Sequence, residues 1–151
     1  MMNEICKETR GLSCCLDERT QILMADGMRK EIWKITIGDY IFSADGKFCM
    51  VANIMKGREE NCLEITCENG FSVITTPEHR FLTTQGWITA SAIDADTMLL
   101  DERNNPVRVA CIEKKDETHN VFNLLFKSPT ILIANGLQSG DFAIQNGRMP
   151  E

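Results

Sequence analysis

Two adjacent cysteines near the start of the chain, Cys14 and Cys15, are the first residues whose types and spacing suggest chemistry. An apolar residue, three polar residues, a threonine and a strand-like run follow them over residues 16–23. Residues 1–14 are too few and too polar for a domain, so Cys15 lies where a flanking tail meets the fold. A thiol there faces the carbonyl of its own preceding peptide bond and can attack it. The alternative is that Cys15 packs as a small apolar side chain.

The seven cysteines form no pattern that is typical of a disulfide framework or a zinc site. Their number is odd, their spacing is irregular, and no Cys-x-x-Cys pair occurs. The chain has only two histidines, His79 and His119, so we predict no metal and no other cofactor. The first residues lack the basic head and apolar core of a signal peptide, which predicts reduced thiols and a cytoplasmic location.

The composition indicates a globular protein of one domain. The chain has 151 residues, of which 43% are hydrophobic and 25% charged, with a net charge of −6. No lysine and arginine cluster is present, so binding to nucleic acid is not expected. No apolar run approaches the roughly 18 residues of a membrane span. We expect a monomer that acts without nucleic acid or membrane.

Short strands separated by turns must position the thiol. Because no segment of 10–12 residues keeps a helical period, the sequence predicts an all-β protein. The clearest local signal is a hairpin of residues 63–67 and 71–75 around Asn69-Gly70, a pair that favours a type I′ turn. A short helical turn fits residues 31–37. Further strands are expected at residues 22–24, 40–43, 48–55, 98–100, 107–112, 121–126 and 130–133.

The sequence also repeats itself weakly at a distance of 57 to 58 residues. Residues 38–42 resemble residues 95–99, and residues 51–54 resemble residues 109–112. Two copies related in this way would pack as a pseudo-two-fold β unit. The alternative is a chance match between two halves that are both rich in strands.

With these pieces placed, the chain resembles a Hint domain, the fold shared by hedgehog autoprocessing domains and inteins, and most of all the bacterial intein-like type. The resemblance covers residues 15–141. It rests on Cys15 with Thr20 at the start and on the Thr-x-x-His block from Thr76 to His79. Later matches are Gly86-Trp87, residues 120–124 and Ala134-Asn135-Gly136. It implies an all-β horseshoe fold with a pseudo-two-fold internal duplication.

The resemblance also implies roles for four residues. Cys15 would attack the carbonyl of Cys14 and convert that amide to a thioester. His79 would protonate the departing α-amine of Cys15. Thr76 would either hold His79 or donate a hydrogen bond to the oxyanion. Asp141 stands at the last position of the domain, where splicing inteins have asparagine.

The far end of the domain departs from the family pattern. Splicing inteins end in His-Asn and continue with Cys, Ser or Thr, whereas the matching residues here are Gly140, Asp141 and Phe142. A family aspartate in the late strand block is replaced by Asn123. Thioester formation at Cys15 is therefore expected, whereas the reaction at the C-terminal junction lacks its usual groups.

These observations predict a self-processing domain of residues 15–141, flanked by residues 1–14 and 142–151. The expected reaction is thioester formation at the Cys14–Cys15 bond, followed by cleavage or acyl transfer rather than efficient splicing. The partners would be the upstream polypeptide as acyl donor and water, a thiol or an amine as acceptor. Two alternatives stay open: an inactive Hint fold that serves as a structural or binding module, and a splicing intein with an unusual C-terminal junction.

Overall fold

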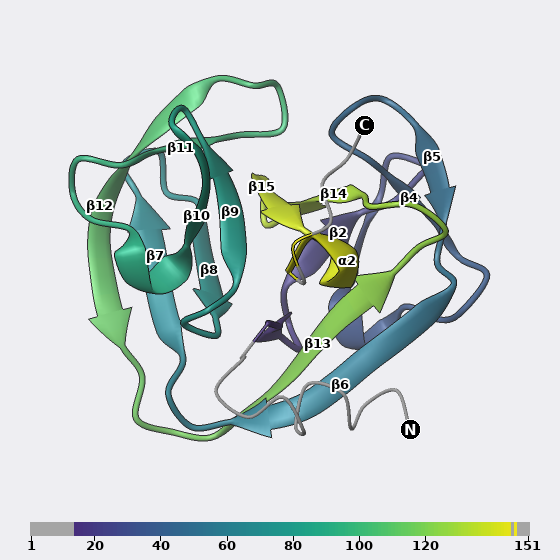
Figure 1. Ribbon diagram of the computed structural model, residues 1–151, viewed down its shortest axis with the longest axis horizontal. Coiled ribbons are helices and arrows are strands. Elements are labelled where there is room, and N and C mark those ends of the chain that lie inside the picture. Colours follow the sequence, from purple (N-terminus) through teal and green to yellow (C-terminus); the bar gives the residue numbers. More distant parts are fainter. Residues whose placement is uncertain (1–13, 146, 148–151) are drawn as a thin grey trace.

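The computed structural model describes residues 14–145 and 147, and almost all of this part is built from short strands (Figure 1). Most of the predicted N-terminal flank lies outside the described residues, as do 146 and 148–151. The all-β class is confirmed. In chain order the elements are β1 (Leu16–Asp17), β2 (Gln21–Leu23), β3 (Arg29–Glu31), η1 (Ile32–Lys34), β4 (Tyr40–Phe42), β5 (Phe48–Met50), β6 (Asn53–Glu59), β7 (Leu63–Cys67), β8 (Ser72–Thr75), β9 (Arg80–Thr83), β10 (Gly86–Thr89), η2 (Ala90–Ala92), β11 (Met98–Leu100), β12 (Pro106–Lys114), β13 (His119–Leu125), β14 (Ile131–Ala134), β15 (Leu137–Gly140) and α2 (Phe142–Gln145).

One curled, antiparallel sheet carries most of the strands. Its order is β3-β2-β14-β15-β9-β11-β12-β7-β8-β1-β13-β6, with β10 added on β9, and β4 and β5 form a separate pair. Figure 1 shows the two lobes of the resulting horseshoe, with the long strands β6 and β13 running side by side below them. The curl brings Cys14 and Cys15, which precede β1, into one buried cluster with Phe142 of α2.

The internal duplication is visible in the backbone hydrogen bonds. Both 3-10 helices are three residues long and start 58 residues apart, at Ile32 and Ala90. The N–H of Val51 donates to the carbonyl of Asp39, and 58 residues later the N–H of Val109 donates to Thr97. The same backbone path therefore occurs twice, as the weak sequence repeat predicts.

The two halves exchange their long strands. β6 of the first half pairs with β13 of the second, while β7 of the first half pairs with β12 of the second. Each half thus completes the sheet of the other, so neither half can bury its apolar face alone. β1 lies at the junction, between β8 and β13.

The Asn69-Gly70 hairpin forms, but its turn is not of type I′. Type I′ needs positive φ at both central residues, whereas here Gly70 has φ 93° and Asn69 does not have positive φ. The N–H of Gly70 donates to Cys67, and the N–H of Phe71 donates to the side-chain oxygen of Asn69. The loop therefore has three residues, with glycine in the left-handed position. The side chain of Asn69 accepts the N–H of Phe71, and Asn69 does not adopt positive φ.

The expected long strand over residues 48–55 is divided into β5 and β6. β5 turns back onto β4, whereas β6 starts again at Asn53 and runs along β13. The N–H of Val51 between them donates to Asp39, and that of Ala52 donates to Leu125. Because Val51 and Ala52 bond to different segments, the continuous apolar run of residues 48–55 is divided into two strands.

Buried side chains form two clusters. The larger fills the horseshoe and includes Leu16, Ile65, Phe81 and Leu124. The smaller contains Cys14, Cys15, Met55, Cys62, Val121 and Phe142. Burial raises the pKa of the Cys62 thiol to about 12 and that of Cys67 to about 11, so both stay protonated and pack as apolar side chains. Cys111 lies in β12 and is exposed.

Candidate active site around the Cys14–Cys15 bond

β1 brings Cys15 between two other strands. Although β1 has only two residues, Leu16 pairs with Thr75 of β8 on one side and with Phe122 of β13 on the other. Cys15 precedes β1 directly, so it lies beside Thr76 and Asn123, the residues that follow these pairing positions. Antiparallel pairing thus assembles three segments that are far apart in the sequence.

Thr76 holds the backbone of Cys15 at both its nitrogen and its oxygen. The Thr76 hydroxyl accepts the N–H of Cys15 at 2.9 Å and donates to the carbonyl oxygen of Cys15 at 3.0 Å. The N–H of Thr76 donates to the same carbonyl at 3.0 Å. The predicted contacts for Thr76 were His79 or the oxyanion. Its hydroxyl instead lies on the nitrogen that would leave.

Asn123 contacts the carbonyl that would be attacked. Its side-chain Nδ2 donates to the carbonyl oxygen of Cys14 at 2.6 Å, and the residue is fully buried. Its Oδ1 accepts the N–H of Leu124 at 2.7 Å, which fixes the orientation of the amide. A donor already placed on this oxygen would stabilise negative charge that develops there. The sequence singled out Asn123 only as a departure from the family pattern.

His79 lies next to the same peptide bond and is fully buried. Burial lowers the pKa of His79 to about 4, and a hydrogen bond to the backbone of Cys14 opposes that shift. The ring is therefore neutral at pH 7. Its Nε2 lies 2.6 Å from the hydroxyl of Ser139, and its face meets Phe81 edge-on with a centroid distance of 5.2 Å. Ser139 was not predicted as a site residue, because its link to His79 spans 60 residues.

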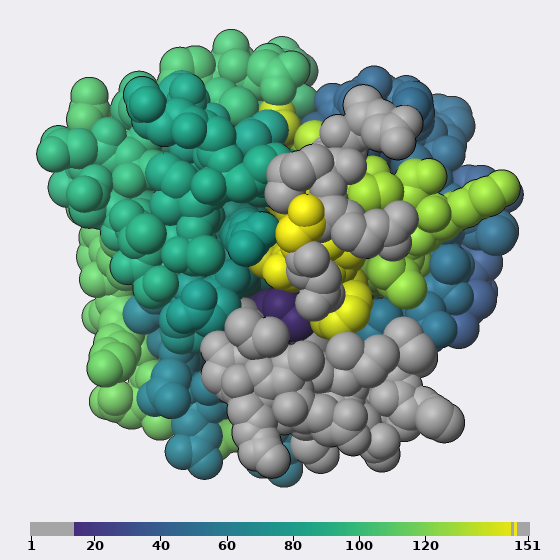
Figure 2. Space-filling model, viewed as in Figure 1, coloured from purple at the N-terminus to yellow at the C-terminus, as the bar shows by residue number. Residues whose placement is uncertain are grey.

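The end of the domain meets its beginning. Phe142 packs in the same buried cluster as Cys14 and Cys15, and α2 packs against β13 and β15. In Figure 2 the purple atoms, at the start of the described residues, adjoin the yellow atoms near their end at the middle of this face. Both junctions of the predicted domain are therefore close together in space.

Asp141 is fully buried and caps α2. Its side-chain Oδ1 accepts the N–H of Ile144 at 3.0 Å, and its backbone N–H donates to Thr130 at 3.1 Å. Aspartate is among the preferred residues at a helix N-terminus, because it accepts such an N–H. The carboxylate thus has a structural contact at the position where the family has asparagine.

Gly140 has no room for a side chain in this arrangement. A Cβ atom at this position would lie 2.7 Å from Ile144 Cγ2 and 2.9 Å from Gln145 Nε2. A histidine before Asp141, as splicing inteins have, would push aside the side chains of Ile144 and Gln145.

His119 takes no part in this site. Its Nδ1 lies 2.7 Å from Asp17 and its Nε2 lies 3.4 Å from Glu117, and its side chain is only 11% exposed. The sequence predicts an exposed histidine, which is wrong: strand pairing of β13 with β1 carries His119 onto the Asp17 carboxylate.

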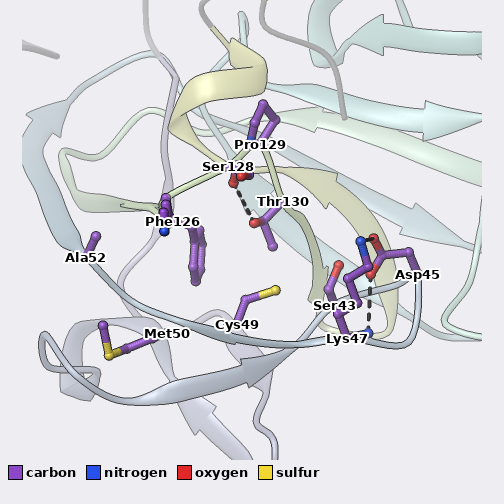
Figure 3. A pocket seen from close by; sticks show the side chains of 11 residues that line it. Ser43, Asp45, Lys47, Cys49, Met50, Ala52, Phe126, Ser128, Pro129 and Thr130 are labelled. Atoms are coloured by element: carbon purple, nitrogen blue, oxygen red, sulfur yellow. Dashed lines mark hydrogen bonds and ion pairs between the residues drawn. The ribbon is translucent and has the colours of Figure 1, made fainter. Parts of the chain in front are cut away.

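A cavity of about 330 Å³ lies apart from this site, between β5 and the loop before β14 (Figure 3). Cys49 and the ring of Phe126 point into it, and burial raises the pKa of the Cys49 thiol. No predicted site residue lines the cavity. Its connection to the site is through Thr130, whose carbonyl accepts the N–H of Asp141.

Neither a metal site nor a membrane span is found in the part of the chain that the structure describes. No group of three or more histidine, cysteine, aspartate or glutamate side chains could hold a metal ion there. No helix in residues 14–145 has the length and apolar character needed to cross a membrane.

The curled duplicated sheet, with a buried cysteine at its start and a Thr-x-x-His turn beside it, defines a Hint domain of the intein type. The sequence model of the family described as Hom_end-associated Hint matches residues 15–73. This match over the first part of the fold supports a Hint domain, a fold that supports an autoprocessing or splicing role.

Solved inteins have the same fold. The crystal structure of the gp41-1 intein is 26% identical, with a TM-score of 0.70 over 83% of this chain and 96% of the intein. A DnaB intein from Synechocystis sp. PCC 6803 is 18% identical, with a TM-score of 0.70 over 84% of this chain and 97% of the intein. Among curated proteins, none matches this sequence significantly.

Proposed function

We propose that residues 15–141 form an autoprocessing unit that converts the Cys14–Cys15 peptide bond to a thioester and leads to cleavage or acyl transfer there. The observation that carries this proposal is the set of contacts on that one bond. Asn123 binds the Cys14 carbonyl oxygen, Thr76 binds the Cys15 nitrogen, and His79 lies against the Cys14 backbone. A buried structural cysteine needs none of these three contacts.

The first step is an acyl shift from nitrogen to sulfur. Sγ of Cys15 bonds to the carbonyl carbon of Cys14, and the negative charge that forms on the oxygen faces the Asn123 amide. The C–N bond to Cys15 then breaks. The α-amine takes a proton from His79, and the proton that the thiol loses replaces it on the ring, so that His79 is neutral before and after the step.

The second step releases the upstream chain. Water, a thiol or an amine bonds to the Cys14 carbonyl carbon, and the C–S bond breaks. The Cys15 thiol is restored, and the fragment that begins at Cys15 stays intact. The acyl acceptor thus comes from outside the unit.

The C-terminal end of the domain lacks the groups that efficient splicing needs. Splicing requires a hydroxyl or thiol after the domain to take the acyl group, whereas Phe142 has neither and packs into the apolar cluster. Asparagine cyclisation needs a carboxamide nitrogen, whereas Asp141 has a carboxylate that caps α2. Each missing group removes one step, so we expect no ligated product.

A fusion of a folded reporter protein upstream of Met1, followed by the whole chain, tests the proposal. Mass spectrometry should show release of the reporter with Cys14 at its new C-terminus, faster with added thiol. Cys15→Ala should abolish this release, while the matched variant Cys14→Ala should leave it largely intact. An intact fusion under all conditions would support the inactive module, and ligation of both flanks would support splicing.

A further inference from the structure

Residues of the downstream segment reach the histidine of the upstream site. Gln145, at the end of α2, has its Nε2 3.5 Å from Nε2 of His79. The Ser139 hydroxyl lies 2.6 Å from the same ring nitrogen. Both contacts are on the side of the ring away from Nδ1, so they bear on which ring nitrogen carries the proton.

The orientation of the Gln145 amide follows from its other contacts. Its Oε1 lies 2.8 Å from the backbone nitrogen of Arg80, which can only donate, so the oxygen must face Arg80. The NH₂ group then faces the carbonyl oxygen of Gly140 at 3.1 Å and the ring of His79. An amide NH₂ tolerates a lone pair on Nε2 and opposes a second N–H there.

With the NH₂ of Gln145 facing Nε2, the Ser139 hydroxyl donates to that nitrogen. A neutral imidazole then has its single proton on Nδ1. Nδ1 has no hydrogen-bond partner of good geometry within the described residues, while the Cys14 backbone lies close enough to affect the ring's pKa. Because Ser139 and Gln145 take up Nε2, Nδ1–H is the group left to meet the Cys14 backbone.

We propose that Ser139 and Gln145 are positioning residues that keep the proton of His79 on Nδ1, so that the downstream segment, through Gln145, controls cleavage at the upstream bond. The proposal rests on the proposed function for its rate effects. The tautomer of His79 is a separate property, and it exists whether or not the bond breaks.

The position of Gln145 is itself fixed by residues around the site. Arg80, next to His79, donates from its side chain to the carbonyl of Ile144 at 3.2 Å. Asp141 caps the same short helix, and Gly140 leaves the space that Ile144 and Gln145 fill. Removing or redirecting the chain after Asp141 would therefore remove a contact from the ring of His79.

Nuclear magnetic resonance of the ring nitrogens tests the tautomer directly in the uncleaved Cys15→Ala protein. The chain has only two histidines, so a His119→Gln variant assigns the signals. We expect the parent at pH 7 to show a neutral His79 with its proton on Nδ1. Ser139→Ala and Gln145→Glu should move the proton toward Nε2, because one removes a donor and the other places an acceptor beside it. Ser139→Thr, which keeps the hydroxyl, should retain the parent pattern.

The cleavage rate of the reporter fusion tests the control of the reaction. Ser139→Ala and Gln145→Glu should each slow release by about 10²-fold, the loss expected when a catalytic group is misdirected. Gln138→Leu is the matched control, because Gln138 is buried in the same strand but donates to Asp101 and Asn104. It should leave both the tautomer and the rate unchanged.

A proton on Nε2 in the parent protein, or an unchanged tautomer in both variants, would overturn the proposal. So would full-speed cleavage by a variant whose tautomer has changed. If the parent fusion does not cleave at all, the proposed function fails, while the tautomer measurement still decides whether Ser139 and Gln145 position the ring.

Discussion

Thr20 occupies in the first half of the duplicated fold the place that His79 occupies in the second. The N–H of Thr20 donates to Asp17 at 2.9 Å, and the N–H of His79 donates to Thr76 at 3.2 Å. The carbonyl of Thr20 accepts the first N–H of η1, and the carbonyl of His79 accepts the first N–H of η2. One backbone turn therefore serves as part of the candidate site in one half and as structure in the other.

This equivalence predicts that Thr20→Val stabilises the protein without affecting cleavage. The Thr20 hydroxyl is buried and has no hydrogen-bond partner within the described residues. Valine has a similar shape and no polar group to bury, so the free energy of unfolding should rise by about 1 kcal/mol. Thermal unfolding should show a transition a few degrees higher. A lower transition would mean that the hydroxyl has a partner.

Removing the amide of Asn123 should slow release of the upstream chain. In Asn123→Leu the volume is kept but the donor to the Cys14 oxygen is lost, so we expect a loss of about 10²–10³ in rate. Asn120→Leu is the control, since Asn120 is exposed on the same strand and reaches only Glu18. Release from the reporter fusion measures both, with circular dichroism to confirm folding. Equal rates for the two variants would remove Asn123 from the mechanism.

Replacing His79 should slow thioester formation while His119 serves as the comparison. We expect His79→Gln to reduce the rate by about 10²–10⁴, the usual contribution of acid–base catalysis. Glutamine is preferable to alanine because His79 is fully buried and its side chain must still fill the space beside Phe81. His119→Gln should cleave at the parent rate. If His79→Gln cleaves as fast as the parent, water rather than His79 transfers the proton.

The buried neutral state of His79 predicts a pH dependence of stability. In the unfolded chain a histidine takes up a proton near pH 6.5, whereas in the folded protein the pKa of His79 is lowered to about 4 because of burial. Stability is therefore complete above pH 6.5 and is lost as the pH falls toward 4. The loss from this group is up to about 3 kcal/mol over that range.

Urea unfolding of Cys15→Ala at several pH values measures this loss. The carboxylates of the chain also affect stability in acid, so the comparison is with the same protein that carries His79→Gln. The difference between the two curves should shrink from pH 6.5 to pH 4, as the parent loses the contribution of the neutral ring. A difference that stays constant with pH would show that the pKa of His79 is the same in the folded and the unfolded protein.

Restoring cleavage after residue 141 should require space for a side chain at residue 140 as well as the residues that the family has there. Gly140→His, Asp141→Asn and Phe142→Cys together restore the missing groups, but a side chain at residue 140 meets Ile144. Adding Ile144→Ala should therefore increase cleavage after residue 141 relative to the triple variant. Mass spectrometry of the downstream fragment compares them. If neither variant cleaves, closeness of the two junctions is not enough for the second half of the chemistry.

The parts of the fold that follow from local signals could be predicted from the sequence. The alternation around Asn69-Gly70 predicts the hairpin, and the resemblance of residues 76–79 to the Thr-x-x-His block implies a position beside Cys15. The turn type was not predictable, because the side chain of Asn69 accepts the N–H of Phe71 in place of a second residue at positive φ.

The contacts across the site could not be predicted, because they join distant residues. Asn123 is 109 residues from Cys14, and Ser139 is 60 residues from His79. Neither lies in a pattern with its partner, and only the pairing of β1 with β13 and of β9 with β15 brings them together. Gln145 belongs to a segment that the sequence assigns to the flank, so no site residue was expected there.

The exchange of long strands between the halves also determines when the chain can act during its own synthesis. The side chains around Cys15 include Asn123 of β13, and the ring of His79 needs Ser139, so the site at Cys15 is complete only after residues more than one hundred positions later have been made. A nascent chain leaves the ribosome from its N-terminus and folds its long-range strand pairs last. Under the proposed function, a protein fused upstream would stay covalently joined throughout translation of the domain, and it would have that whole interval to fold before its link could be broken.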